Sequence, residues 1–207
     1  MTRLTSQAQK SITVNGVEHK LNTSYRAALL TWNAFEAVHS KEISPLAAAV
    51  VSIDNMLGID VAQLEENVID KLLKAIAEYL IKYARTSERG KTDDKPPLLD
   101  LEQDATMIYD AFMSMGIDLD EKEVSYPRFM SLLRELPKDA QICRVVYLRQ
   151  QRRKGKLTKE EKEECNRRGW DVINIKNRKA EREAADNKEY FKNLQNELRA
   201  AKGLPPV

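Results

Sequence analysis

Hydrophobic residues recur along most of this chain with the spacing of α-helices, and one short stretch instead alternates as β-strands do. That stretch is SITVNGVEHKL, residues 11–21, with two runs rich in β-branched residues around an Asn-Gly pair. Asn-Gly favours a type I′ turn, because both central positions of that turn need positive φ. The pattern predicts an antiparallel hairpin that packs on the helix after it. Its inner face is predicted to carry Ile12, Val14, Val17, His19 and Leu21.

Three helices are predicted to follow the hairpin. The second has Ser44 as its N-cap, Pro45 in its first turn and Gly58 after its end, which are ordinary start and stop signals. The first helix, which follows capping residues, has these apolar residues at helical spacing: Tyr25, Ala28, Leu29, Trp32, Phe35 and Val38. The third helix, within 60–83, has this stripe: Leu64, Val68, Leu72, Ile76, Leu80 and Tyr83.

A polar stretch with two adjacent prolines, TSERGKTDDKPP, separates these helices from a second helical set. We expect a flexible loop there, because the stretch is long and hydrophilic. Three helices are predicted next: one over 101–115, one in VSYPRFMSLLREL and one starting at Pro137. Thr158 and Glu161 then form a capping box that opens a polar helix, which we expect to stop near Gly169.

The stretch DATMIYDAFMSMGIDL, residues 104–119, combines aromatic residues, methionines and carboxylates. Its apolar residues fall at helical spacing, so we interpret the aromatics as core residues and not as catalytic groups. Gly116 is expected to end the helix in the left-handed conformation, followed by Ile117 as an apolar contact. The predicted core of this helix, with Ala105 on the same stripe, is Ile108, Tyr109, Phe112 and Met115.

Charge divides the chain unevenly. Residues 144–202 contain 18 basic and 10 acidic residues, a net charge of +8, so the rest carries −6 of the total of +2. Apolar residues become sparse after Trp170, which indicates a protruding charged helix. We therefore predict a mainly α fold: a multi-helix bundle with an N-terminal β-hairpin and a protruding charged C-terminal helix. The predicted segments are a flexible N-terminus (1–10), hairpin plus helices (11–85), a flexible loop (86–99), a second helical half of the same core (100–157) and a charged extension (158–207).

Residues for catalysis, metal binding or cofactor binding do not come together in this sequence. The chain has two histidines and two cysteines, no CxxC pair and no GxxxxGK pattern. The acidic run at 116–123 lacks the central glycine and final glutamate of a calcium loop. We expect no enzyme activity, no disulfide, no metal and no cofactor. No stretch is long and apolar enough for a membrane span or signal peptide, so a cytosolic protein without membrane partners is expected.

The basic run RVVYLRQQRRKGK, residues 144–156, interleaves cationic, aromatic and apolar residues. Three interpretations remain open: a solvated helix end that complements the helix dipole, a surface for an acidic protein partner, or, less favoured, a nucleic-acid contact. The candidate partner-binding residues are Arg144, Tyr147, Arg149, Arg152 and Arg153.

Three blocks of the sequence resemble a family of small conserved proteins encoded in tail operons of long-tailed phages of Gram-positive bacteria. The blocks are VNGVEHKLNTSYRAAL, DATMIYDAFMSMGIDL and RFMSLLRELPKDAQICRVVYLRQ, and the resemblance covers about residues 10 to 150. SYPRF departs from an aromatic-rich segment usual in that family. The matching motif residues are Val14, Gly16, Asn22, Thr23, Asp104, Ala105, Ile108, Tyr109, Ala111, Phe112, Gly116, Ile117, Asp118 and Leu119.

Members of that family are encoded just upstream of the tape measure gene, in the position of tail assembly chaperones. The resemblance implies a chaperone that binds the tape measure protein in the host cytoplasm during infection, with tail tube subunits as a further partner, and that leaves before the virion matures. Self-association along the partner would increase avidity. The resemblance implies no catalytic residues. The alternatives are a tail or connector subunit that stays in the virion and a basic nucleic-acid-binding accessory protein.

Overall fold

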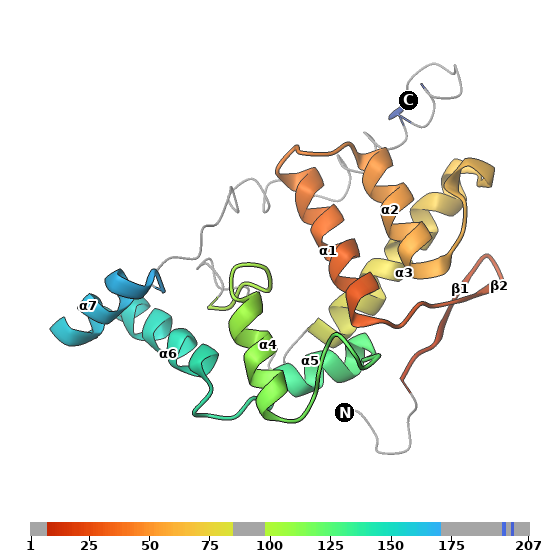
Figure 1. Ribbon diagram of the computed structural model, residues 1–207. Coiled ribbons are helices and arrows are strands. Elements are labelled where there is room, and N and C mark those ends of the chain that lie inside the picture. The colour runs from red at the N-terminus through yellow and green to blue at the C-terminus, as the bar shows by residue number, and fades with distance from the viewer. Residues whose placement is uncertain (1–7, 85–97, 171–195, 198–199, 201–207) are drawn as a thin grey trace. The chain divides into compact units, whose positions relative to one another are not determined.

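A computed structural model describes residues 8–84, 98–170, 196–197 and 200 of this protein (Figure 1). The described part is mainly helical, with seven α-helices and one two-stranded antiparallel sheet. The predicted mainly α fold with an N-terminal hairpin is confirmed. The charged helix expected after Trp170 lies almost wholly outside the described residues, as do the predicted N-terminus and most of the loop at 86–99.

By its internal contacts the chain divides into two compact units. Unit 1 comprises Met1–Glu88, Ser125–Pro127 and Asn177–Val207, and unit 2 comprises Arg89–Val124 and Arg128–Lys176. The sequence analysis placed 11–85 and 100–157 in one core and the residues from 158 in an extension. By contacts, 125–127 belong with unit 1 and the helix after Thr158 belongs with unit 2, and the predicted division into segments stays a prediction.

The hairpin of unit 1 has the predicted turn and register. Strand β1 (Ser11–Val14) pairs antiparallel with β2 (Val17–Lys20), and Val14 lies opposite Val17. Asn15 and Gly16 have φ of 51° and 80°, as a type I′ turn requires. A further backbone hydrogen bond, from Leu21 N to the carbonyl of residue 10 (2.8 Å), extends the pairing.

The hairpin packs on α3 (Glu66–Ala84), so the prediction that it packs on the helix directly after it is wrong. That helix, α1, buries its apolar face against a different helix, whereas α3 offers a long apolar stripe to β1. Ile12, Val14 and Leu21 are buried as predicted. Val17, predicted on the same face, is 56% exposed, although Val14 opposite it is buried.

Helices α1 (Tyr25–His39) and α2 (Pro45–Leu57) pack closely through small side chains. The buried small residues are Ala27, Ala28, Thr31 and Ala34 on α1 and Ala48, Ala49 and Ser52 on α2. Small side chains permit a short distance between helix axes. Most of the large residues predicted to form the buried stripe of α1, from Leu29 to Val38, are therefore only half-buried.

Helix α3 follows the short 3-10 helix η1 (Val61–Gln63) and supplies the largest part of the core of unit 1. Its buried residues are Ile69, Leu72, Leu73, Ile76, Tyr79 and Leu80. Three residues of the predicted stripe, Leu72, Ile76 and Leu80, are therefore buried, whereas Leu64, Val68 and Tyr83 are half-buried. Tyr126, 1% exposed, joins this core. Its hydroxyl accepts a hydrogen bond from Trp32 Nε1 (3.0 Å) and donates one to the Leu80 carbonyl (3.3 Å).

Unit 2 contains α4 (Ala105–Ser114), most of α5 (Tyr126–Arg134), α6 (Gln141–Arg153) and α7 (Lys159–Arg168). Phe112 of α4 stacks on Phe129 of α5 with ring centroids 5.3 Å apart. Helix α7 starts with the predicted capping box and ends at Gly169, which has a φ of 65°. The further buried residues of this core include Ile108, Ala111, Leu119, Ile142, Val145, Leu148 and Cys165.

Helix α4 starts four residues later than predicted. Residues 101–104 form a turn instead, because the Asp100 carboxylate accepts hydrogen bonds from the amides of Glu102 and Gln103. Gly116 has the expected positive φ of 73°, and Ile117 N donates to the Phe112 carbonyl (3.0 Å), which confirms the predicted helix end.

The predicted core of α4 is confirmed for Ile108 and Phe112, which are 3% and 0% exposed. Tyr109 and Met115 are only half-buried. The hydroxyl of Tyr109 donates to Asp118 Oδ1 (3.0 Å), and this contact keeps the polar end of the ring near the surface. Ala105, predicted on the same stripe, is exposed because it lies in the first turn of the helix.

Candidate partner-binding surface

Helix α6 has one buried face and one exposed face. Ile142, Val145, Leu148 and Arg149 lie on the buried face. Arg144 and Tyr147 lie on the other face, where the side chain of Arg144 and the residue Tyr147 are each 44% exposed. Both belong to the five residues predicted to bind a partner.

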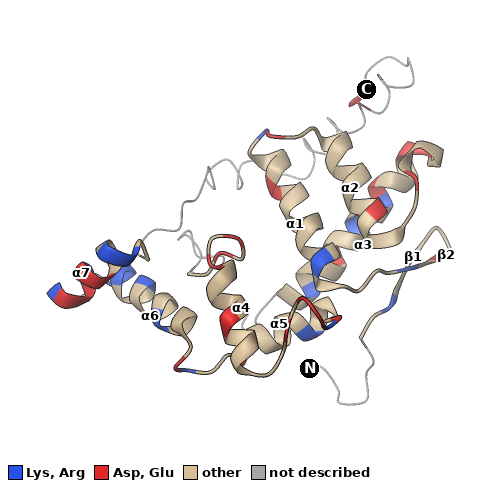
Figure 2. Ribbon diagram, viewed as in Figure 1, with Lys and Arg blue, Asp and Glu red and all other residues tan. Residues whose placement is uncertain are grey.

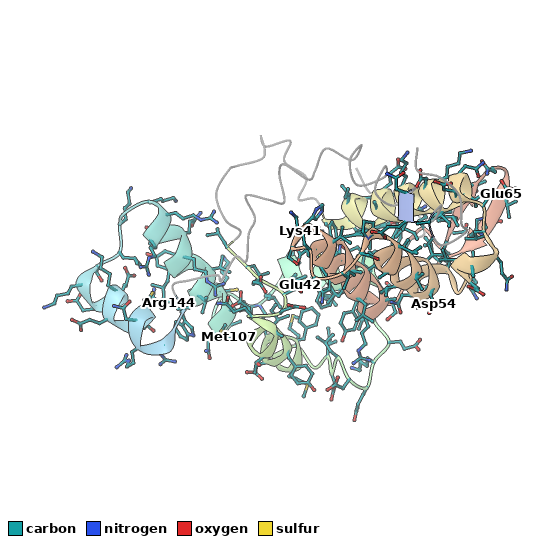
Figure 3. All side chains as sticks on the ribbon, turned by 90° about the horizontal axis from the view of Figure 1, so that it is seen from above. Lys41, Glu42, Asp54, Glu65, Met107 and Arg144 are labelled. Atoms are coloured by element: carbon teal, nitrogen blue, oxygen red, sulfur yellow. The ribbon has the colours of Figure 1, made fainter. Side chains whose placement is uncertain are left out.

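Arg144 connects α6 to the acidic face of α7. Arg144 is labelled in Figure 3. Its Nη2 lies 3.3 Å from Glu164 Oε2 and 3.5 Å from Glu161 Oε1, and its guanidinium carbon lies 5.3 Å from the centroid of the Tyr147 ring. These contacts fix the direction of a long side chain and partly neutralise its charge. We call Arg144, Tyr147, Glu161 and Glu164 together the α6–α7 surface.

Figure 2 shows that α7 carries both signs of charge. Its first turn has Glu160 and Glu161, and its last turn has Arg167 and Arg168, which complements the helix dipole at each end. The surface beside Arg144 is therefore of mixed charge. Such a surface orients a partner of complementary charge pattern more than it attracts one kind of charge.

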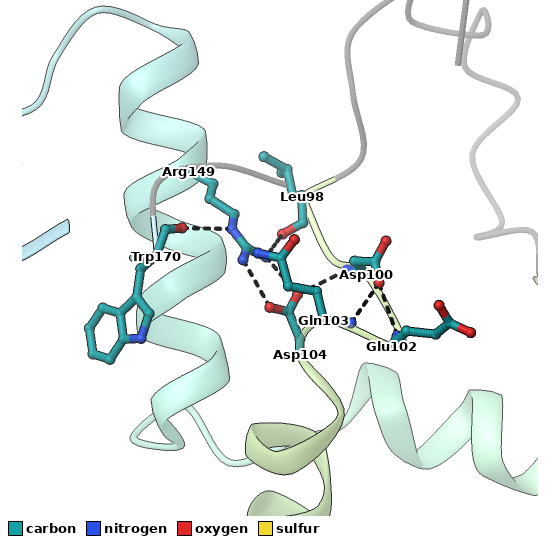
Figure 4. A network of polar contacts seen from close by, with 7 residues as sticks. All are labelled: Leu98, Asp100, Glu102, Gln103, Asp104, Arg149 and Trp170. Atoms are coloured by element: carbon teal, nitrogen blue, oxygen red, sulfur yellow. Dashed lines mark hydrogen bonds and ion pairs between the residues drawn. The ribbon is translucent and has the colours of Figure 1, made fainter. Parts of the chain in front are cut away.

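Arg149 does not lie on this surface, although the sequence analysis included it among partner-binding residues. It is 5% exposed, and its guanidinium pairs with the Asp104 carboxylate at 2.6 and 2.8 Å (Figure 4). Nε donates to the Trp170 carbonyl (2.9 Å), and Nη1 also donates to the Leu98 carbonyl (3.0 Å). Four of the five N–H donors of the guanidinium are thus used inside unit 2. The contacts of Arg149 are therefore those of a structural residue.

The buried position of Arg149 could have been predicted from helical spacing, although the residue belongs to a basic run. It falls seven residues after Ile142 and four after Val145, so helical spacing places it on the core face. Its partner Asp104, 1% exposed, was noted only as a motif residue. Besides Arg149, Asp104 accepts a hydrogen bond from the amide of Asp100 (2.9 Å), so it joins the turn before α4 to α6.

Arg152 and Arg153 lie in the last turn of α6. Arg152 is exposed, and Arg153 is half-buried with its Nη2 lacking a hydrogen-bond partner. The helix ends at Arg153, and Gly155, with a φ of 66°, follows between two exposed lysines at 154 and 156. These residues extend the basic edge of the α6–α7 surface, and their role in partner binding stays a prediction.

The Asp118 loop after α4 uses its oxygens within the protein. Asp118 Oδ1 accepts from the amide of Asp120 (2.8 Å) and from the Tyr109 hydroxyl, and these hydrogen bonds lower the pKa of Asp118. The same hydrogen bond from Tyr109 raises the pKa of that tyrosine to about 12. This arrangement stabilises one conformation of the loop.

The described residues contain no group of three or more His, Cys, Asp or Glu side chains that suits a metal ion. The two cysteine thiols are not paired with each other, and burial raises the pKa of both. A raised pKa lowers the thiolate fraction and hence the reactivity of a cysteine. Within the described ranges, no helix has the length and apolar character to span a bilayer.

Comparison with known proteins identifies a family. No curated protein and no solved structure matches the chain. The model of a family described as bacteriophage Gp15 protein matches residues 4–168, which include every named helix and strand of both units. This range covers well over half of the 207 residues. The protein therefore belongs to the bacteriophage Gp15 protein family.

Proposed function

We propose that this protein is a tail assembly chaperone that binds the tape measure protein of its phage during tail assembly. The observation that carries the proposal is membership of a bacteriophage protein family. The resemblance of its three sequence blocks to proteins encoded next to tape measure genes supports the more specific role. In this proposal the protein acts in the host cytoplasm, with tail tube subunits as a further partner.

The α6–α7 surface is the part of the molecule that we assign to the partner. Tyrosine and arginine are enriched among the residues that dominate binding energy at interfaces, and Arg144 lies over the ring of Tyr147. A helical partner would place an apolar residue against Tyr147 and charged residues opposite Arg144, Glu161 and Glu164. The charges give orientation, and the aromatic contact gives affinity.

The proposal is tested by co-expression with the tape measure protein of the same phage. We expect the tape measure protein to become soluble and to co-purify with this protein, and to aggregate when an unrelated helical protein replaces it. An insoluble tape measure protein that does not co-purify would contradict the proposal. The same preparation with tail tube subunits tests the further partner.

A subunit that stays in the virion is the main rival function. Mass spectrometry of purified phage particles distinguishes the two, because a chaperone leaves before the particle is complete. We expect the protein to be absent from particles while it is abundant in the infected cell. A fixed number of copies in each particle would support the structural role instead.

A further inference from the structure

The first turn of α2 leaves one backbone N–H group without a local acceptor. Pro45 has no N–H group, and the N-cap residue Ser44 accepts from Ala47 N through its hydroxyl (3.1 Å) and from Ala48 N through its carbonyl (3.1 Å). The remaining donor is Leu46 N. Helix ends commonly satisfy such donors with side chains or water.

The acceptor for Leu46 N comes from the far end of the chain. Glu197 Oε2 lies 3.0 Å from Leu46 N, although the two residues are 151 positions apart. Helix α2 has no acidic residue in its own first turn, so the Glu197 carboxylate also supplies the negative charge that complements the helix dipole. Hydrogen bonds with an ionised acceptor are stronger than neutral ones.

Two further facts connect this contact with unit 1. Glu197 is half-buried, and residues 196 and 197 are helical. By its contacts Glu197 belongs to unit 1, as α2 does. Glu197 lies outside the range 4–168 that matches the family, so the contact is a feature of this chain beyond that match.

We propose that the N-terminus of α2 is a docking site for the short helical piece of this chain at residues 196–197, held there by the Glu197 carboxylate. The site accepts a carboxylate because Ser44 and Pro45 leave a single free donor beside the positive end of a 13-residue helix. The proposal does not depend on the chaperone function.

The Leu46 amide reports directly on this contact. In the full chain labelled with ¹⁵N, Glu197→Ala removes the acceptor, so we expect hydrogen exchange of the Leu46 amide to accelerate by about tenfold and its chemical shift to change. Glu197→Gln keeps an acceptor without the charge, so its exchange rate for the Leu46 amide should lie between those of the wild type and Glu197→Ala. Unchanged amides of Ile69 and Tyr79 would show that the core of unit 1 remains folded.

Glu42→Ala is the matched control. Glu42 is an exposed carboxylate two residues before Ser44, close in sequence to the same helix end. Its removal should change the exchange of the Leu46 amide by less than about twofold, because no contact to that amide is lost. If Glu42→Ala and Glu197→Ala have the same effect, or if Glu197→Ala has none, the proposal is wrong.

Rescue in trans provides a second readout. A synthetic peptide of residues 190–203, YFKNLQNELRAAKG, is added to the full-length Glu197→Ala protein. We expect the peptide to restore the wild-type shift and slow exchange of the Leu46 amide, and a peptide with alanine at position 197 to have no effect. Identical behaviour of both peptides would overturn the assignment of the carboxylate.

Discussion

At the scale of single residues, the Asp104–Arg149 pair is the strongest polar feature of unit 2. Both residues are at least 95% buried, and Arg149 makes four hydrogen bonds with donor–acceptor distances of 2.6 to 3.0 Å. A buried pair stabilises a fold only when its remaining donors and acceptors also have partners. Here carbonyls of Leu98 and Trp170 supply them, so the pair connects three segments that are distant in sequence.

Removal of one partner from this pair should be costly. Arg149→Ala leaves the Asp104 carboxylate buried without its cation, and we expect the free energy of unfolding to fall by about 3–5 kcal/mol. Urea denaturation followed by circular dichroism measures the loss. The control is Arg144→Ala, which removes an arginine that is 44% exposed from the same helix and should cost less than about 1 kcal/mol. Equal losses for both variants would contradict the structural role of Arg149.

Two tyrosines of unit 1 form a matched pair for a second prediction. The Tyr126 hydroxyl has two hydrogen-bond partners, whereas the Tyr79 hydroxyl is buried and has none within the described part of the chain. The centroids of the Tyr79 and Tyr126 rings are 6.1 Å apart. The two side chains share one environment but differ in how their polar atoms are satisfied.

Replacing each tyrosine with phenylalanine should therefore have opposite effects. Tyr126→Phe leaves Trp32 Nε1 without its acceptor, and we expect a loss of about 1–3 kcal/mol in the free energy of unfolding. Tyr79→Phe removes an unsatisfied hydroxyl, and we expect no loss or a gain of up to about 1 kcal/mol. Thermal and urea denaturation of both variants give the comparison. A loss for Tyr79→Phe as large as that for Tyr126→Phe would refute it.

Asp70 of α3 gives a prediction that depends on pH. Burial raises its pKa above the ordinary value of 3.8, the neighbouring carboxylate of Glu66 raises it further, and Lys74 partly opposes the shift. Oδ1 of Asp70 is buried without a hydrogen-bond partner. The charged form is thus disfavoured in the folded state, so the unfavourable contribution is absent below pH 3.8 and grows as pH rises through the folded pKa.

Asp70→Asn removes this charge while preserving the shape of the side chain. We expect the variant to have a higher melting temperature than the wild type at pH 7, and the difference to vanish at about pH 3, where Asp70 is protonated in both states. Melting curves measured across this range test the sign. A variant that is less stable than the wild type at pH 7 and equally stable at low pH would show that the carboxylate is favourable.

At the scale of elements, the local features were predictable from the sequence and the contacts between elements were not. The Asn15-Gly16 turn, the Ser44 cap, the Gly116 helix end and the Thr158 capping box depend on residues within one turn of each other. The choice of α3 as the support of the hairpin depends on which helix has an apolar face left after its other contacts form. Spacing within one helix contains no such information.

The α1–α2 contact shows why size matters as well as polarity. The predicted stripe of α1 is confirmed at Tyr25 and Ala28, whereas Trp32 and Phe35 are half-buried. The other buried residues of α1 are small ones that were not predicted: Ala27, Thr31 and Ala34. Alanine counts as weakly apolar in a periodicity pattern, although it permits the closest approach of two helices. A pattern based on hydrophobicity alone therefore placed the buried stripe of α1 partly on the wrong face.

Ala28 provides the test of this close packing. Ala28→Leu adds three carbon atoms at a position that is 0% exposed, and we expect a loss of about 1–3 kcal/mol because the helices have to move apart. Ala47→Leu is the control, since Ala47 is an exposed residue of α2. Chemical denaturation of both variants measures the difference. Equal stability of the two variants would mean that the α1–α2 contact tolerates a larger side chain.

At the scale of the whole molecule, the family match spans named elements of both units and ends at residue 168, before the segment that carries Glu197. The assignment of Ser125–Pro127 to unit 1 was not predictable. It depends on hydrogen bonds of Tyr126 with Trp32 and Leu80, which are distant from it in the sequence. Of the candidate partner-binding residues predicted from the basic run, Arg144 and Tyr147 lie on an exposed face. Arg149 was predicted with them because it is basic, but it is buried.

The central claim is that the α6–α7 surface binds the tape measure protein. The most direct measurement compares how much tape measure protein co-purifies with the wild type, with Tyr147→Ala and with Arg128→Ala, where Arg128 is an exposed residue of α5 in the same unit. Tyr147→Ala should reduce the recovered tape measure protein by about tenfold, as loss of a central interface tyrosine does, and Arg128→Ala should leave it unchanged. Equal recovery with all three proteins would contradict the assignment of the surface, and no recovery with the wild type would contradict the proposed function itself.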